Sequence, residues 1–146
     1  MGYDVHITRK NDWLDDDGEE ISISEWKNYI SSDPEMRLDG YAEAITPNGT
    51  LRVESEGMAV WLNWSKHEKD GGMAWMDHSG GNVISTNPDD EVLKKMFEIS
   101  LILNAKVQGE ECEVYDADGQ SNWKELKEEG LRLRKLMDKK WWQLWK

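Results

Sequence analysis

Hydrophobic and polar residues alternate over several short stretches of the chain, and this alternation predicts strands. The stretches are residues 3–8, 41–46, 51–54, 58–65, 73–78 and 83–86. Successive side chains of a strand point to opposite faces, so a period of two indicates one buried face. Pro47-Asn48-Gly49, Gly71-Gly72 and Gly80-Gly81 supply turn residues between stretches. The middle of the chain is therefore predicted to be an antiparallel meander.

Two other stretches carry the start signals and the three-and-four spacing of helices. Ser22 and Glu25 form a capping-box pattern at the start of the first helix. Asn87 is expected to cap the second helix, with Pro88 at its first position. Residues 99–103 are apolar on nearly every side, so the end of the second helix is expected to be deeply buried.

The predicted order is a strand, a helix, several strands, a second helix and a final strand region within residues 106–115. This order indicates the α+β class, with an antiparallel sheet that carries two helices on one face. A ferredoxin-like core with an enlarged central meander fits it best. A length of 146 residues suits one acidic domain over residues 1–121, followed by a basic, Trp-rich helix over residues 122–146.

The formal net charge of −12 is divided unevenly between these two parts. Residues 122–146 contain eight basic and four acidic side chains, while residues 1–121 contain 10 basic and 26 acidic ones, a net charge of −16. Such an acidic body repels phosphate backbones, so nucleic acid is not expected as a partner. It attracts basic proteins, and the candidate contact is a loop of carboxylates: Asp15, Asp16, Asp17, Glu19 and Glu20. The alternative is that the charge serves solubility alone.

The motifs of several catalytic and metal-binding sites are absent. The chain has no glycine motif for phosphate, and its histidines (His6, His67 and His78) lack the spacing of metal ligands. The single cysteine, Cys112, lies among glutamates that would raise the pKa of its thiol. We therefore predict no catalytic residue, no metal and no cofactor. A lone cysteine favours a reducing, cytoplasmic setting, and no apolar run approaches the ~18 residues of a membrane span.

Nine tryptophans are the main departure from an average composition. Those on the meander strands are expected to be core residues, since large aromatic side chains are buried on average. The alternative is a site for a small ligand or a substrate on the meander, formed by Trp61, Trp75, Asp77 and His78.

The last residues of the chain combine aromatic and basic side chains: Lys139, Lys140, Trp141, Trp142 and Trp145. Because opposite charges attract, this tail is expected to dock on its own acidic body. Insertion into a membrane interface or into the groove of a partner is the alternative. The sequence leaves the position of the tail and the oligomeric state open.

Several capping and core segments resemble a group of small bacterial cytoplasmic proteins of unassigned function. These segments are Met1–Asp4, Ile21–Trp26, Asp33–Arg37, Asn87–Asp89 with Lys95 and Met96, and Gly109–Asp116. The resemblance covers roughly residues 1–116 and leaves out the basic tail. It implies a bacterial cytoplasmic protein and supplies no catalytic residue.

The negative charge and the missing catalytic motifs together predict a non-enzymatic protein that recognises a basic protein partner, as an immunity or antitoxin protein does. A ligand sensor or an enzyme with its site on the meander is one alternative. Peripheral attachment to a membrane through the tail is the other.

Overall fold

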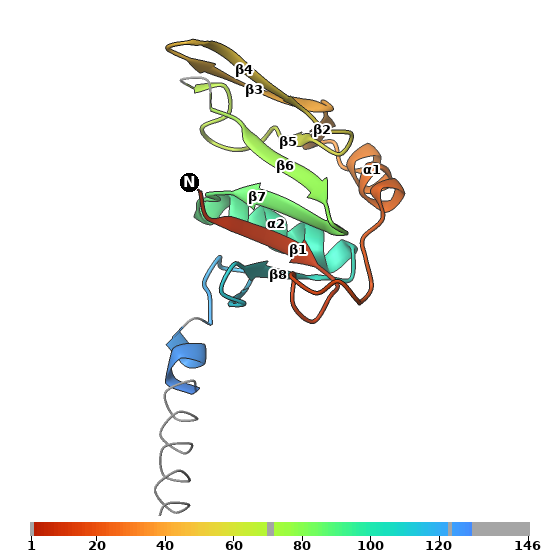
Figure 1. Cartoon of the computed structure of the whole chain (residues 1–146), viewed down its shortest axis with the longest axis vertical. Coiled ribbons are helices and arrows are strands. Elements are labelled where there is room, and N and C mark those ends of the chain that lie inside the picture. The colour runs from red at the N-terminus through yellow and green to blue at the C-terminus, as the bar shows by residue number, and fades with distance from the viewer. Residues whose placement is uncertain (1, 70–71, 123, 130–146) are drawn as a thin grey trace, which may run out of the picture.

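The computed structural model describes residues 2–69, 72–122 and 124–129 of the chain (Figure 1). The elements are β1 (Asp4–Thr8), α1 (Ile23–Ser32), β2 (Met36–Leu38), β3 (Tyr41–Thr46), β4 (Gly49–Glu54), β5 (Ala59–Trp61), β6 (Ala74–Ser79), β7 (Asn82–Thr86), α2 (Asp90–Ile102), β8 (Lys106–Gly109) and β9 (Val114–Tyr115). Residues 124–129 are also helical. Most of the predicted C-terminal helix, residues 122–146, lies outside the described residues.

Seven of the strands form one sheet in the order β2-β5-β6-β7-β1-β8-β9, and β3 and β4 form a separate two-stranded ribbon. All of these strand pairs are antiparallel. Figure 1 shows the ribbon at one end of the molecule, beyond β5 and β6, and α2 against the sheet near β1 and β7. The predicted α+β class with an antiparallel sheet is confirmed.

Four of the strands have the order of a ferredoxin-like core, as predicted. In the series β8-β1-β7-β6, α1 lies between β1 and β6 in the chain, and α2 lies between β7 and β8. Each helix therefore connects two strands that run in the same direction with a third strand between them, which is the split β-α-β arrangement. The strands β2, β3, β4 and β5 are inserted between α1 and β6, and they make up the enlarged meander.

The two faces of the sheet have different surroundings. The helix face carries Val5, Ile7, Met76 and Val83, which pack with α1 and α2 in one hydrophobic core. The residues between them in the sequence point the other way, to a side that we call the open face. The register aligns His6, Ile84 and Asp77 across three neighbouring strands of the open face, and Trp75 lies two residues from Asp77.

The predicted start of the first helix is confirmed, but the predicted cap of the second is wrong. The Ser22 side chain accepts a hydrogen bond from the Glu25 backbone N–H at 3.1 Å, which completes the capping box. In α2 the N-cap is Asp89, whose carboxylate accepts from the Val92 N–H at 2.9 Å. Asn87 instead has a left-handed φ of 50° and accepts from the Tyr3 N–H at 2.8 Å, because Asn tolerates this conformation and can bond to nearby backbone.

Two apolar stretches also differ from their predictions. The strand expected over residues 58–65 is limited to Ala59–Trp61, because the chain turns at Leu62 and Asn63. At the end of α2, Leu101 and Ile102 are 67% and 68% exposed. Only one side of this helix faces the sheet, so the apolar run is not buried all round.

Candidate functional site

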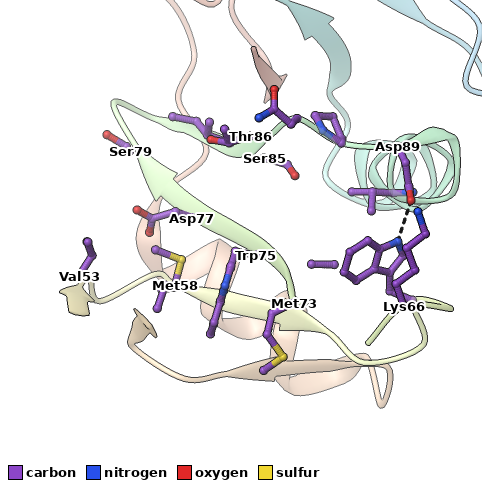
Figure 2. Close-up of a pocket in the computed structure, with 17 residues that line it drawn as sticks. Val53, Met58, Lys66, Met73, Trp75, Asp77, Ser79, Ser85, Thr86 and Asp89 are labelled. Carbon is purple, nitrogen blue, oxygen red and sulfur yellow. Dashed lines mark hydrogen bonds between the residues drawn. The ribbon is translucent and has the colours of Figure 1, made fainter. Parts of the chain in front are cut away.

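The sheet opens into a cleft between β6 and β7, because only half of β6 pairs with β7. Ala74, Trp75 and Met76 pair with β5, while residues 77–79 pair with β7. The ladder to β7 ends at the pair of Asp77 with Ile84. Beyond this pair the two strands separate, and Figure 2 shows the pocket that lies between them.

The tight turn that joins β6 to β7 defines which residues face each other across this cleft. Gly80 and Gly81 have φ values of 59° and 79°, as a two-residue hairpin turn requires. Continuing the register beyond Asp77 and Ile84 would place Trp75 opposite Thr86, but the two do not pair. Both residues line the cleft instead, so each strand presents a backbone edge without a partner strand on that side.

The wide end of the cleft is closed by the segment that follows β5. The indole Nε1–H of Trp64 donates to the Asp89 carboxylate at 2.9 Å, shown as the dashed line in Figure 2. The Ser65 backbone N–H and hydroxyl donate to Glu91 at 2.9 and 2.6 Å. These bonds join the meander to the start of α2.

The cleft has the size and lining of a binding site. Its volume is about 650 Å³, within the usual range of ligand pockets. The apolar part of the lining includes Val53, Met58, Met73, Trp75 and Ile84. A second hollow of about 690 Å³ lies against the same Met73 and Trp75, so Trp75 lines two neighbouring depressions.

Carboxylates outnumber cations around these two hollows. The carboxylates are Asp39, Glu43, Glu68, Asp77 and Asp89, and the cations are Arg37 and Lys66. Arg37 donates two hydrogen bonds to Asp39, at 2.6 and 3.1 Å. Asp77 accepts at Oδ1 from the Ser55 hydroxyl and the His78 N–H, at 2.7 and 2.8 Å, while its Oδ2 makes no hydrogen bond to the described residues.

The β3–β4 ribbon forms the outer wall of the cleft and has one apolar side. Ala42 is opposite Val53 and Ala44 is opposite Leu51 on that side, and the two larger side chains, Val53 and Leu51, are 51% and 59% exposed. On the other side Arg52 forms ion pairs with neighbouring carboxylates and lies 4.1 Å from the Tyr41 ring centroid. Charged groups are thus gathered on one side of the ribbon, and the side toward the cleft stays apolar.

The four residues of the predicted meander site do not converge. Trp75 and Asp77 lie together in the cleft. Trp61 is on the helix face, 8% exposed, and its indole donates to Glu35 at 3.0 Å. His78 follows Asp77 directly and therefore points to the helix face, where its Nε2 meets the carbonyl of Ile21.

The predicted acidic loop is held on the surface by buried anchors. The Lys10 ammonium donates to the carbonyls of Asp15 and Gly80, at 2.8 and 2.9 Å. Asp16 and Asp17 are exposed and form no hydrogen bond or ion pair with the described residues. The Glu19 carboxylate lies 3.8 Å from Arg9, and the Glu20 side chain lies against Gly81. The loop therefore presents carboxylates to solvent from a fixed base.

The described lining of the cleft contains neither histidine nor cysteine. Burial, together with Asp12 and Glu113, raises the pKa of the Cys112 thiol, as predicted in direction. No three His, Cys, Asp or Glu side chains are grouped for a metal ion in residues 2–69, 72–122 and 124–129.

The sequence did not lead us to predict that the β3–β4 ribbon, Met58 and Met73 line a cleft. One available signal was the run Met73-Ala74-Trp75-Met76, because it is apolar on both faces, whereas an alternating strand has one polar face.

The predicted tail residues Lys139, Lys140, Trp141, Trp142 and Trp145 lie outside the described residues, and their docking stays a prediction.

Comparison of the chain with family models, with curated proteins and with solved structures finds no match. None of the helices in the described residues has the length and apolar composition needed to cross a bilayer.

Proposed function

We propose that this is a non-enzymatic binding protein of the bacterial cytoplasm that recognises a basic protein partner. The observation that carries the proposal is the set of exposed carboxylates without cations on the acidic loop, above all Asp16 and Asp17. They belong to a body of 121 residues with 26 acidic and 10 basic side chains. A fixed, one-signed surface of this kind attracts an oppositely charged protein and speeds the encounter.

The packing around the loop supports a role in recognition. Trp13 covers the buried His6, and the backbone of Trp13 bonds to the side chains of Gln108 and Asn82 at 2.8 and 3.1 Å. A loop that is ordered before binding loses little conformational entropy when a partner arrives. The carboxylates of the loop are therefore placed for binding in the free protein.

Affinity capture from native lysate at low salt, with the full chain as bait, tests the proposal. We expect one basic protein in stoichiometric amount, released as salt is raised because exposed charge pairs are screened. The double variant Asp16→Asn/Asp17→Asn should retain less of it. Glu98→Gln/Asp118→Asn is the matched control, since it removes the same charge from exposed positions elsewhere. Absence of a partner, or an equal loss in both variants, would contradict the proposal.

A small-ligand site is the second candidate function, because Trp75 and Asp77 line a cleft of about 650 Å³. An aromatic ring beside a carboxylate suits a small organic cation. Spermidine serves as the probe, and binding should shift the Trp75 indole resonance in NMR spectra. An unchanged spectrum at saturating spermidine in low salt would count against this candidate.

A further inference from the structure

We propose that the cleft between β6 and β7, with the β3–β4 ribbon as its outer wall, binds an extended basic segment of the protein partner. One apolar side chain of that segment packs against Trp75, and flanking lysines or arginines lie beside the carboxylates of the two hollows. This inference rests on the proposed function, because it names the part of the partner that is bound and the place where it binds.

The first observation is the apolar surface at the centre of the cleft. Trp75 is half-buried and lines the two hollows, with Met73 beside it in both. Tryptophan supplies a large rigid contact area, and methionine adapts its shape to different side chains. Across from them Val53 is 51% exposed, so an apolar side chain that enters the cleft finds apolar surface on two sides.

The second observation is the unpaired strand edge. The ladder between β6 and β7 stops at Asp77 and Ile84, and both Trp75 and Thr86 line the opening. An extended segment can add main-chain hydrogen bonds to an edge of this kind, while its alternate side chains enter the pockets on either side. A helix presents no free backbone groups to such an edge, so the geometry favours an extended occupant.

The third observation is the sign of the charge. Five carboxylates and two cations line the two hollows. Two of the carboxylates are already paired, Asp39 with Arg37 and Glu43 with Arg52 of the ribbon, so Lys66 is the one other cation in the described lining beside Glu68, Asp77 and Asp89. The free Oδ2 of Asp77 lies where the cleft narrows, next to the last pair of the ladder. A basic segment matches this lining, whereas an acidic one would be repelled.

A synthetic peptide probe, acetyl-Lys-Leu-Lys-Val-Lys-Leu-Lys-amide, tests the inference on the full chain by NMR. Saturable shifts are expected for the backbone amides of Trp75, Thr86 and Val53 and for the Trp75 indole, and the affinity should fall as salt is raised. Two control peptides separate the contributions, one with glutamate in place of lysine and one with serine in place of the apolar residues. Both should bind at least about 10-fold more weakly.

Three substitutions locate the site. Trp75→Ala should weaken binding of the probe by about 10-fold or more, as expected for a central aromatic contact. Val53→Lys places a cation on the apolar wall at an exposed position, so the fold is retained while the probe is repelled. Leu101→Lys is the matched control, since Leu101 is 67% exposed on α2, away from the cleft. It should leave the affinity within about 2-fold.

The outcomes separate this inference from the proposed function. Equal effects of Val53→Lys and Leu101→Lys would overturn the inference, as would binding of the glutamate peptide or shifts confined to residues 15–20. A partner that is captured from lysate equally well by the Val53→Lys variant and by the unchanged chain would also overturn it, while the proposed function would stand. If the bait captures no partner, the proposed function itself fails.

Discussion

The indole of Trp13 is stacked on the imidazole of His6, with ring centroids 4.0 Å apart and ring planes 11° from parallel. His6 is 3% exposed as a result, and its Nδ1 has no hydrogen-bond partner among the described residues. The acidic loop is attached to the sheet through this contact, so the ionisation of a buried side chain is linked to the placement of the surface carboxylates.

This burial predicts a loss of stability in mild acid. Burial lowers the pKa of His6, partly offset by Asp4 and Glu110. The unfolded chain, with a pKa of about 6.5, therefore takes up the proton first as the pH falls. The contribution of His6 is complete above about pH 6.5 and is lost as the pH falls through the folded pKa.

Urea unfolding at a series of pH values checks this. The free energy of unfolding should decrease between about pH 7 and pH 5, and His6→Phe should reduce that decrease because a phenyl ring stacks without taking up a proton. The matched control His67→Phe should leave the decrease in place. If the free energy of unfolding of His6→Phe depends on pH in the same way as that of the unchanged chain, the protonation of His6 does not affect stability.

We expect substitution of the buried Lys95 to lower the free energy of unfolding strongly. Its ammonium lies 2.8 Å from Asp33 and 3.6 Å from Glu35, and its side chain is 4% exposed. Lys95→Met would leave the Asp33 carboxylate, whose side chain is 11% exposed, without a cation, at a cost of about 3 kcal/mol. Asp33 still accepts hydrogen bonds from the Tyr29 hydroxyl and the Glu35 N–H, so the cost stays at the low end.

The double variant Lys95→Met/Asp33→Asn should recover more than half of that loss, because the uncompensated charge is gone. Urea denaturation of the two single variants and the double variant gives the coupling energy directly. Additive effects of the two substitutions would show that the ion pair contributes nothing specific.

Trp64→Phe tests the closure at the wide end of the cleft. The change removes the bond from the indole to Asp89, which also caps α2 through the Val92 N–H. A lost hydrogen bond to a carboxylate should lower the free energy of unfolding by about 1.5 kcal/mol. Trp75→Phe is the matched control, since the Trp75 indole donates no hydrogen bond to the described residues. A loss of equal size in both variants would assign the effect to ring size alone.

In the turn between β6 and β7, we expect a substitution at Gly81 to reduce stability more than a substitution at Gly80. A side chain at Gly81 would be strained at φ 79° and would place a Cβ 2.3 Å from Glu20 Oε2. Gly81→Ala should therefore cost about 1–2 kcal/mol in thermal unfolding experiments. Gly80 has open space around it, and Asn is favoured at this turn position, so Gly80→Asn should stay within about 0.5 kcal/mol. A reversed order of the two effects would contradict the assigned turn.

The parts of the fold that depend on neighbours in sequence could be predicted. Ser22 and Glu25 are three residues apart, and the capping box they form needs no distant contact. The order of helices and strands was sufficient for the ferredoxin-like arrangement. The cap of α2 was not predictable in this way, because Asn87 and Asp89 are both good caps. The backbone of Tyr3, 84 positions away from Asn87, decides between them.

The cleft depends on how distant strands pair, and this cannot be read from a short stretch of sequence. β6 lies between β5 and β7, and it pairs with β5 over residues 74–76 but with β7 only over residues 77–79. The cleft exists because the ladder to β7 stops at Asp77, and this depends on the spatial relation of two strands. Trp61 and His78 had the right chemistry for a site, but alternation along the strands turned them to the helix face. Leu101 and Ile102 show the same limit, since an apolar run does not say which of its sides is covered.

The ribbon that forms the outer wall of the cleft lies within a single insertion, and the order of the remaining elements is that of a ferredoxin-like fold. The strands β8, β1, β7 and β6 with their two helices satisfy the connectivity of a complete small domain, and β2 to β5 are added between α1 and β6. The inserted strands β2 and β5 contribute Met36, Ala59 and Trp61 to the core, whereas the two strands of the ribbon are largely exposed. Substitutions at exposed positions of the ribbon can therefore alter the wall of the cleft at little expense to folding. Related chains that keep the scaffold and diversify this insertion would acquire new specificities, in the way that loops do on an immunoglobulin framework.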